Sequence, residues 1–163
     1  SFLDPPLVGV AWDDSVYYLA RKTLFKGPTK WLYPRWNAIP IDQEAPDMSS
    51  LKKIIKILRS GEQVVVFPEG ARTLDGKLQP GEAGVGLIAA KSNATIQPIR
   101  IFGAYKALPR GSGRLRFHPI TIVVGDPITL TPEERKTKGR EAYQAISDRI
   151  MAAIAKIKHP SES

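Results

Sequence analysis

The spacing of apolar and polar side chains predicts helices alternating with short strands in the middle of the chain. Residues 48–62 fit one amphipathic helix, and Gly61 ends it because glycine favours the C-terminal end of a helix. The apolar face of this helix is formed by Leu51, Ile54, Ile55 and Leu58. The continuous apolar run over residues 64–67 then predicts a short buried strand.

The same alternation continues toward the C-terminus. A helix rich in small residues is expected to begin near Glu82, and strands are expected over residues 95–104 and 114–124. Pro132 should begin one long helix, since proline suits the first helical turn. The apolar positions of that helix recur at helical spacing and are Tyr143, Ile146, Ile150, Ile154 and Ile157.

Helix–strand alternation with short connections indicates an α/β fold: a single domain with a mixed central sheet flanked by helices. Further strands are expected near residues 15–19 and 39–42. The 163 residues suit one domain with a substantial core. This domain is expected to span residues 1–158, and residues 159–163 are expected to form a flexible tail.

The formal net charge of +8 is distributed unevenly along the sequence. Residues 15–41 and 83–125 contain lysine and arginine but no acidic residue. Such windows favour anionic partners, namely phosphate esters, acidic lipid surfaces or nucleic acid, although a solvated basic surface gives the same pattern. The absence of cysteine excludes disulfides, thiolate metal sites and a cysteine nucleophile. No apolar run approaches the ~18 residues of a membrane span.

The stretch VVVFPEGARTLDG combines a strand end with residues suited to ligand binding. Pro68 cannot donate a sheet hydrogen bond, so regular pairing should stop there, and Gly70 permits a positive φ. Arg72 offers a planar charged fork that suits phosphate. Because ligands gather at the carboxyl ends of strands in open α/β sheets, Glu69 and Arg72 are candidate site residues. A tight turn closed by a Glu69–Arg72 ion pair is the alternative.

The two histidines, His118 and His159, are interpreted as structural or exposed side chains. Neither has partners at metal-ligand spacing, so no metal site is expected. The P-loop signature and the G-x-G-x-x-G pattern are both absent from the sequence, which argues against nucleotide binding through those motifs.

Five short blocks resemble, in order, those of the glycerolipid acyltransferases, specifically the 1-acylglycerol-3-phosphate acyltransferases. SFLD at residues 1–4 resembles the second half of the family motif Asn-His-x-Ser-Phe-x-Asp. FPEGART at residues 67–73 resembles the block Phe-Pro-Glu-Gly-Thr-Arg-Ser. The remaining blocks are ARKTLF at residues 20–25, NAIPID at residues 37–42 and IQPIRI at residues 96–101. The resemblance covers roughly residues 1 to 130.

The resemblance implies a glycerolipid acyltransferase-like fold and a role in phospholipid biosynthesis. The implied reaction moves a fatty acyl group from acyl-ACP or acyl-CoA to the sn-2 hydroxyl of 1-acylglycerol-3-phosphate, forming phosphatidic acid without a cofactor. Asp4 would orient the catalytic histidine, and Glu69, the second position assigned to catalysis, belongs to the block that shapes the acceptor site. The implied substrate-binding residues are Ser1, Arg21, Lys22, Gln43, Phe67, Pro68, Gly70, Arg72 and Thr73. The protein would contact the cytoplasmic side of an anionic membrane peripherally and would not bind nucleic acid.

Two departures from the family pattern qualify these expectations. The family histidine would lie two positions before Ser1, and a general base contributes roughly a hundred- to ten-thousand-fold in rate. We therefore expect the chain as given to lack its N-terminal end and to be nearly inactive. Gln43 stands where the family usually has an arginine that binds the acceptor phosphate, which leaves the acceptor less certain than the reaction type. The alternative function is a catalytically silent basic module that binds anionic lipid or nucleic acid.

Overall fold

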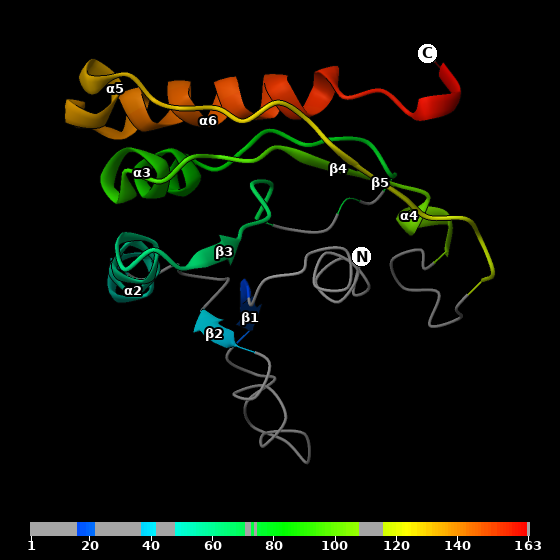
Figure 1. The fold of residues 1–163 in the computed structure, drawn as a ribbon, viewed down its shortest axis with the longest axis horizontal. Helices are drawn as coiled ribbons and strands as arrows, with labels where there is room; N and C mark the ends of the chain where they lie inside the picture. The colour runs from blue at the N-terminus through cyan, green and yellow to red at the C-terminus, as the bar shows by residue number, and fades with distance from the viewer. Residues whose placement is uncertain are drawn as a thin grey trace.

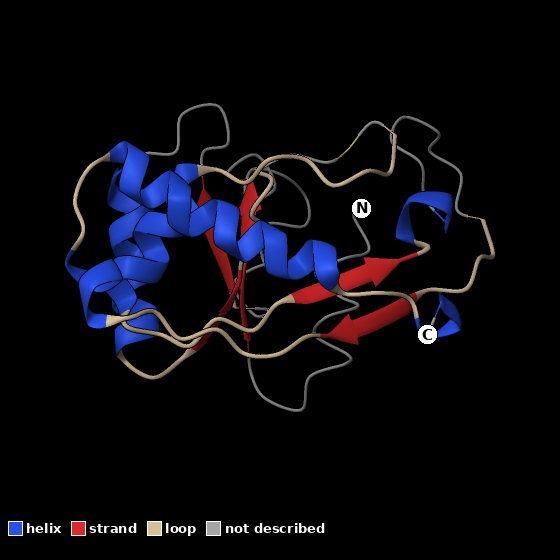
Figure 2. Cartoon of the chain, turned by 90° about the horizontal axis from the view of Figure 1, so that it is seen from above, coloured by secondary structure: helices blue, strands red, loops and turns tan. Residues whose placement is uncertain are grey.

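The computed structural model describes residues 16–21, 37–41, 48–70, 73, 75–107 and 116–162. Its elements are stacked in layers (Figure 1). Helix α6 (Arg140–Lys156) lies at one face, and beneath it lie α3 (Ala83–Ser92) and the strand pair β4 (Ile99–Phe102) and β5 (Thr121–Val124). The opposite side is formed by α2 (Met48–Arg59) and the sheet of β1 (Val16–Arg21), β2 (Ala38–Ile41) and β3 (Gln63–Val65). Seen from above, α6 runs across the molecule from the helical end toward β4 and β5 (Figure 2). The helices and strands thus build a layered α/β arrangement, as the hydrophobic pattern predicts.

One sheet is parallel and has the strand order β2-β1-β3. Its strands are β1 (Val16–Arg21), β2 (Ala38–Ile41) and β3 (Gln63–Val65). In its register Arg21 pairs with Ile41, and Tyr18 pairs with Val65. The expected strands near residues 15–19 and 39–42 are confirmed. β3 ends earlier than the expected strand, so Val66 and Phe67 follow it as an irregular segment.

Helix α2 (Met48–Arg59) is confirmed where the 3.6-residue periodicity predicts a helix, and it is the crossover between β2 and β3. Its buried face centres on Ile54, which is 1% exposed and packs with Ile39 of β2 and Ile88 of α3. A parallel pair of strands requires such a crossover, because the chain must return to the same end of the sheet. α2 therefore fixes where β3 begins and, with it, where the chain emerges at the other end of β3.

The second ladder is an antiparallel pair formed by β4 (Ile99–Phe102) and β5 (Thr121–Val124). Parallel and antiparallel pairing are therefore both present, but the described residues form two separate ladders. Residues 116–120 are not part of a strand, so the strand expected over residues 114–124 is shorter than its sequence pattern indicates. The short helix α4 (Ala104–Ala107) follows β4.

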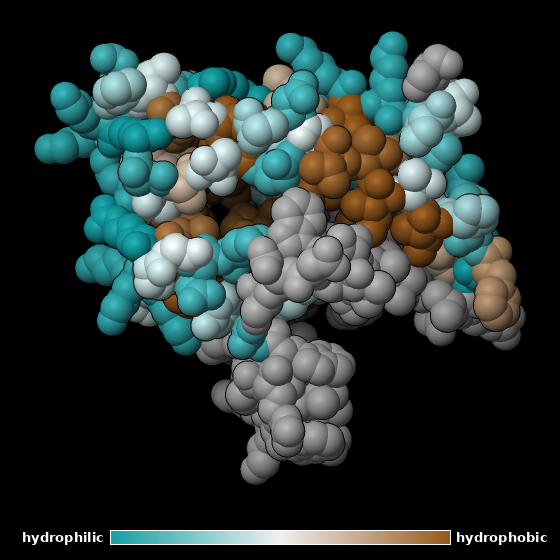
Figure 3. Space-filling model, in the orientation of Figure 1, coloured by the Kyte–Doolittle hydropathy of each residue, from teal (hydrophilic) through white to brown (hydrophobic). Residues whose placement is uncertain are grey.

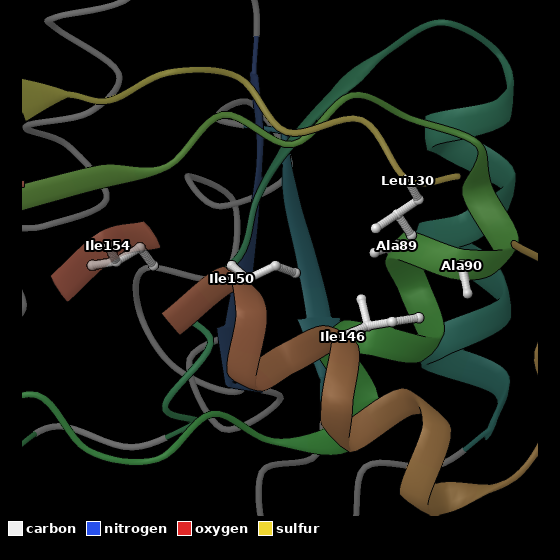
Figure 4. Packing of buried hydrophobic residues seen from close by; sticks show 6 residues of the cluster. All are labelled: Ala89, Ala90, Leu130, Ile146, Ile150 and Ile154. Carbon is white, nitrogen blue, oxygen red and sulfur yellow. The ribbon is translucent and has the colours of Figure 1, made fainter. Parts of the chain in front are cut away.

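The main core lies between α3 (Ala83–Ser92) and α6 (Arg140–Lys156). The side chains of this cluster converge from α3, from α6 and from the segment after β5 (Figure 4). They are Ala89, Ala90, Leu130, Ile146, Ile150 and Ile154. The two helices approach closely because Gly86 has no side chain: a Cβ there would lie 1.8 Å from the backbone oxygen of Tyr143. The small residues of α3 are thus what allows α6 to cover it.

The prediction of a single long helix from Pro132 is wrong, because the chain forms two helices there. α5 (Pro132–Lys136) is separated from α6 by residues 137–139. Thr137 takes an extended conformation, and Gly139 has φ +98°, a value outside the helical region. Pro132 does begin a helix, with Thr131 as its N-cap in a complete capping box with Glu134.

Residues 159–162, for which the sequence predicted a flexible tail, make defined contacts in the structure. His159 lies 3.2 Å through Nε2 from the hydroxyl of Thr121, and its ring meets that of Phe102 edge-on. The 3-10 helix η3 (Pro160–Glu162) follows. These contacts attach this segment to the β4–β5 pair.

Candidate active site

The segment after β3 forms a turn at the carboxyl end of the parallel sheet. The backbone N–H of Gly70 donates to the carbonyl of Phe67 over 3.2 Å, and Gly70 has φ +65°. This left-handed conformation favours glycine, and the space is also tight, because a Cβ on Gly70 would lie 3.1 Å from Cγ of Glu82. The sequence Pro68-Glu69-Gly70 therefore specifies a turn whose shape depends on the absence of a side chain at its last position.

A second segment, the loop that precedes α3, holds this turn through two hydrogen bonds. The backbone N–H of Glu82 donates to the carbonyl of Pro68 over 2.8 Å. The backbone N–H of Gln79 donates to Oε2 of Glu69 over 2.7 Å. One bond fixes the main chain of the turn, and the other holds the carboxylate of Glu69, a residue of intermediate exposure.

The same loop is anchored to the core helix α6. Gln144 donates from Nε2 to the carbonyl of Gly81 over 2.8 Å, and also to Oδ1 of Asp148 over 2.8 Å. Gly81 packs so closely on α6 that a Cβ would lie 2.5 Å from Oγ of Ser147. The position of Glu69 therefore depends on a chain of contacts that runs from α6 through the loop to the turn.

Thr73 and Asp75 build a second turn beyond the first. The hydroxyl of Thr73 donates to Oδ1 of Asp75 over 2.8 Å and accepts the backbone N–H of Gly76 over 3.1 Å. Oδ1 of Asp75 also accepts the backbone N–H of Lys77 over 3.0 Å. Hydrogen bonds stabilise the carboxylate of Asp75 and thereby lower its pKa. The bond from the Lys77 backbone has the largest effect, and the bond from the Thr73 side chain has the next largest. The Thr73 hydroxyl thus shapes the loop that follows residues 67–70.

Parallel pairing also brings Arg21 to this edge of the sheet. Arg21 is the last residue of β1 and pairs with Ile41, the last residue of β2, while β3 runs in the same direction beside β1. Because the carboxyl ends of parallel strands share one edge, the backbone of Arg21 and the turn at residues 67–70 belong to the same end of the sheet. Phe67 is partly exposed there.

Several residues singled out from the sequence lie outside the described part of the chain. They are Ser1, Asp4, Lys22, Gln43 and Arg72. The structure does bring together Phe67, Pro68, Glu69 and Gly70 in one turn, with Thr73 in the next. Sequence reasoning missed Gln79, Glu82 and Gln144, which hold that turn. A weak signal was present in Pro80-Gly81, a dipeptide typical of a turn.

The described residues also bear on two other classes of site. They contain no group of three or more histidine, aspartate or glutamate side chains that could hold a metal ion. None of the helices within the described ranges has the length and apolar character required to cross a bilayer.

The family model described as Acyltransferase matches residues 1–102, a stretch that includes the parallel sheet, the turn after β3 and α3. This match covers more than half of the sequence, and the chain therefore belongs to the acyltransferase family. All five blocks on which the resemblance rests fall within the matched residues.

Named relatives agree with this assignment. A chloroplastic 1-acyl-sn-glycerol-3-phosphate acyltransferase of Brassica napus is 28% identical over 156 residues, covering 90% of this chain and 45% of the relative. A 1-acyl-sn-glycerol-3-phosphate acyltransferase of Bacillus subtilis (strain 168) is 32% identical over 116 residues, covering 69% of this chain and 54% of the relative. The chain thus spans about half the length of these curated relatives.

The fold is also found in a solved structure. A crystal structure of the 1-acyl-sn-glycerophosphate acyltransferase from Thermotoga maritima matches with a TM-score of 0.66 at 22% identity. The match covers 97% of this chain and 62% of the other. The expected glycerolipid acyltransferase-like α/β fold is confirmed by this similarity.

Proposed function

We propose that this chain forms the acyl-transfer domain of a phospholipid-synthesising enzyme, with 1-acylglycerol-3-phosphate as the acyl acceptor. The donor would be a fatty acyl thioester of acyl-carrier protein or coenzyme A. The proposal is supported by the family match, by the names of the relatives, and by the turn at residues 67–70. The observation that carries it is this turn, which presents a positioned Glu69 at the carboxyl end of a parallel sheet.

The proposed reaction joins the acceptor hydroxyl oxygen to the acyl carbonyl carbon and breaks the carbon–sulfur bond of the thioester. The hydroxyl proton passes to a general base and from there to the departing thiolate, so that no cofactor is consumed. In the family pattern the base is a histidine, and Asp4 takes the role of the aspartate that orients it. A neutral hydroxyl attacks a thioester efficiently only when such a base lies within hydrogen-bond reach.

Glu69 and Arg72 take the acceptor side of the proposed site. The Gln79 N–H holds one oxygen of Glu69, which limits the directions in which that carboxylate can meet the acceptor's glycerol portion. Arg72 follows the turn by two residues and supplies a charged fork for the acceptor phosphate. Ser1, Arg21, Lys22 and Gln43 are proposed as further contacts to substrate, as the resemblance implies.

Peripheral contact with an anionic membrane is part of the proposal, because both the acceptor and the product are lipids. An apolar patch lies over the region of β4 and β5 and continues to the edge of the grey atoms (Figure 3). Val124 of β5 is exposed, as is Phe117 in the segment that precedes β5, and Arg116 adjoins Phe117 in the sequence. Apolar side chains beside cations suit the interface between headgroups and acyl chains.

The test is transfer of a labelled acyl group from acyl-ACP and from acyl-CoA to 1-acylglycerol-3-phosphate. We would compare the chain as given with the same chain preceded by a His-x pair, which completes the His-x-x-x-x-Asp spacing to Asp4. Only the extended chain is expected to form phosphatidic acid at an appreciable rate, and Asp4→Ala or Glu69→Ala should remove that activity. Glu62→Ala, an exposed acidic residue before β3, is the matched control. Full activity in Asp4→Ala or Glu69→Ala would contradict the assignment.

A further inference from the structure

A surface pocket of about 450 Å³ lies where the C-terminal ends of α2 and α3 meet α5. Its volume falls within the range of roughly 300–1,000 Å³ that is common for small-molecule sites. Gly61 lines it and precedes β3, whereas Phe67 follows β3, so the pocket and the candidate active site lie at opposite ends of this strand. The pocket is therefore separate from the proposed acyl-transfer site.

The wall of the pocket is strongly basic. Its lining includes Arg59 from the end of α2, Lys91 from the end of α3 and Arg135 from α5, and none of the residues that line it is acidic. These three cations come from three different helices, so the tertiary fold rather than a local run of sequence brings them together. Ser92 and Asn93 complete the polar part of the wall.

The side chain of Arg135 contains an unsatisfied hydrogen-bond donor. Its Nε is buried and has no hydrogen-bond partner among the residues that the structure describes. A buried donor without an acceptor destabilises a fold, and a donor on a charged group does so more strongly. Because solvent does not reach this Nε, an anion in the pocket would supply the missing acceptor only after the Arg135 side chain changes its rotamer, which leaves the backbone in place.

The partial negative charges at the helix C-termini around the pocket oppose anion binding, but the positive charges of the lining side chains are larger. Each helix C-terminus carries a partial charge of about −0.5, so α2 and α3 together contribute about −1. Part of this charge is already satisfied, because Arg59 donates from Nε to the carbonyl of Lys91 over 2.9 Å. The pocket lining carries three formal positive charges, which exceed the partial negative charge of the helix ends. One of them is the ammonium of Lys91, which donates to the carbonyl of Thr137 over 3.0 Å. The net potential favours a ligand that carries more than one negative charge.

We propose that this pocket is a second, noncatalytic site that binds a phosphate group, with Arg135 as its anchor. Phosphate fits better than a single carboxylate, because it offers three or more acceptor oxygens to donors that converge from three helices. The guanidinium of Arg135 would contact it in the fork geometry that arginine forms with phosphates. The phosphate could belong to a free phosphomonoester or to a phospholipid headgroup, which share this chemistry.

The experiment is an NMR titration of the isotope-labelled chain with inorganic phosphate at constant ionic strength. We expect saturable shifts of the amide signals of Gly61, Ser92 and Asn93, and at least tenfold weaker binding in Arg135→Gln, given the strength of hydrogen bonds to charged groups. Arg135→Lys should recover only part of the affinity, because an ammonium lacks the planar fork. Arg140→Gln, which removes the same charge from an exposed position outside the pocket, should bind like the original chain.

The controls separate this site from the proposed acceptor site. Arg72→Gln should leave the shifts at Gly61 and Asn93 intact, so this result does not depend on the acyltransferase proposal. Equal shifts with chloride at the same ionic strength, an absence of saturation, or unchanged affinity in Arg135→Gln would overturn the site. Arg135→Gln should remain folded, because it removes an unsatisfied donor, and its amide spectrum verifies this directly.

A second arm identifies the source of the phosphate. Glycerol 3-phosphate represents a free phosphomonoester, and vesicles containing phosphatidic acid in phosphatidylcholine represent a headgroup. If the headgroup is the ligand, Arg135→Gln lowers vesicle binding more than Arg140→Gln does. If the ligand is free, glycerol 3-phosphate produces the Arg135-dependent shifts while the two variants bind vesicles equally.

Discussion

The backbone N–H of Gln79 donates to Oε2 of Glu69 over 2.7 Å, which joins the loop before α3 to the turn after β3. Ten residues separate the two partners, and the bond spans two segments that have no regular secondary structure at this point. Its effect is to fix a carboxylate at the carboxyl end of the parallel sheet. The surrounding bonds, from Glu82 to Pro68 and from Gln144 to Gly81, connect this turn through the loop to α6.

We predict that Glu69→Ala lowers the free energy of unfolding by about 1–2 kcal/mol, because the Gln79 N–H loses its charged acceptor. Glu69→Gln should cost less, since an amide oxygen can still accept this hydrogen bond. Urea denaturation of both variants measures the difference. Glu62→Ala should change stability by less than about 0.5 kcal/mol, as expected for an exposed position. An equal loss in Glu69→Ala and Glu69→Gln would show that the acceptor oxygen contributes nothing.

Gly70→Ala should destabilise the turn for two reasons, namely its φ of +65° and the contact of its Cβ with Glu82. The left-handed conformation costs about 1–2 kcal/mol, which exceeds the gain of about 0.4–1 kcal/mol from a stiffer unfolded chain. Gly61→Ala has a comparable φ of +89° but meets nothing within 4 Å, so it isolates the conformational cost. Thermal unfolding should therefore show a larger loss for Gly70→Ala. A smaller loss than in Gly61→Ala would rule out the close contact with Glu82.

Gly86→Ala should be among the most destabilising single substitutions in this protein. Its Cβ would lie 1.8 Å from the backbone oxygen of Tyr143, so α3 and α6 would have to separate. Overpacking of this kind costs roughly 1–3 kcal/mol or more, and backbone cannot move aside as a flexible side chain does. Chemical denaturation monitored by circular dichroism gives the loss.

Gly84→Ala is the matched control, because it lies in the same helix and would meet only Leu51, at 3.9 Å. It should raise stability by about 0.5–1 kcal/mol through helix propensity. The same glycine-to-alanine substitution is therefore expected to raise the free energy of unfolding at position 84 and to lower it at position 86. Similar effects at both positions would contradict the close approach of α3 and α6.

The capping box at the start of α5 predicts a dependence of stability on pH. The backbone N–H of Thr131, followed by the side chain of Arg149, lowers the pKa of Glu134 below its ordinary value of 4.5. Because the pKa is lower in the folded state, the contribution of Glu134 is complete above about pH 4.5 and is lost as the pH falls through the lowered value.

Glu134→Gln keeps the capping geometry but removes the charge, so it should be less stable than the original chain at pH 7 by about 0.5–1 kcal/mol. This difference should disappear at low pH, when Glu134 is protonated. Denaturant melts between pH 3 and pH 7 check the prediction, with Glu133→Gln on the same turn as the control. A difference that stays constant with pH would show that the charge is not the cause.

The periodic segments could be predicted from the sequence because they depend on local chemistry. The i, i+3, i+7 pattern of Leu51, Ile54 and Leu58 predicts α2 correctly, and the apolar run before Pro68 predicts the end of β3 within two residues. The break between α5 and α6 was missed. Apolar positions at helical spacing continue through α6 and hide the turn at Gly139, whose positive φ is a property of the backbone.

The sequence by itself determined the family and half of the candidate site, because Phe67, Pro68, Glu69 and Gly70 are adjacent in the chain and specify their own turn. Only the tertiary structure decided what holds that turn and where the basic pocket lies. Gln79 binds Glu69 from ten residues away, and Gln144 anchors the loop at Gly81 from 63 residues away. Arg59, Lys91 and Arg135 come from three different helices. Such contacts depend on how the helices pack, and no local pattern of side chains records that packing.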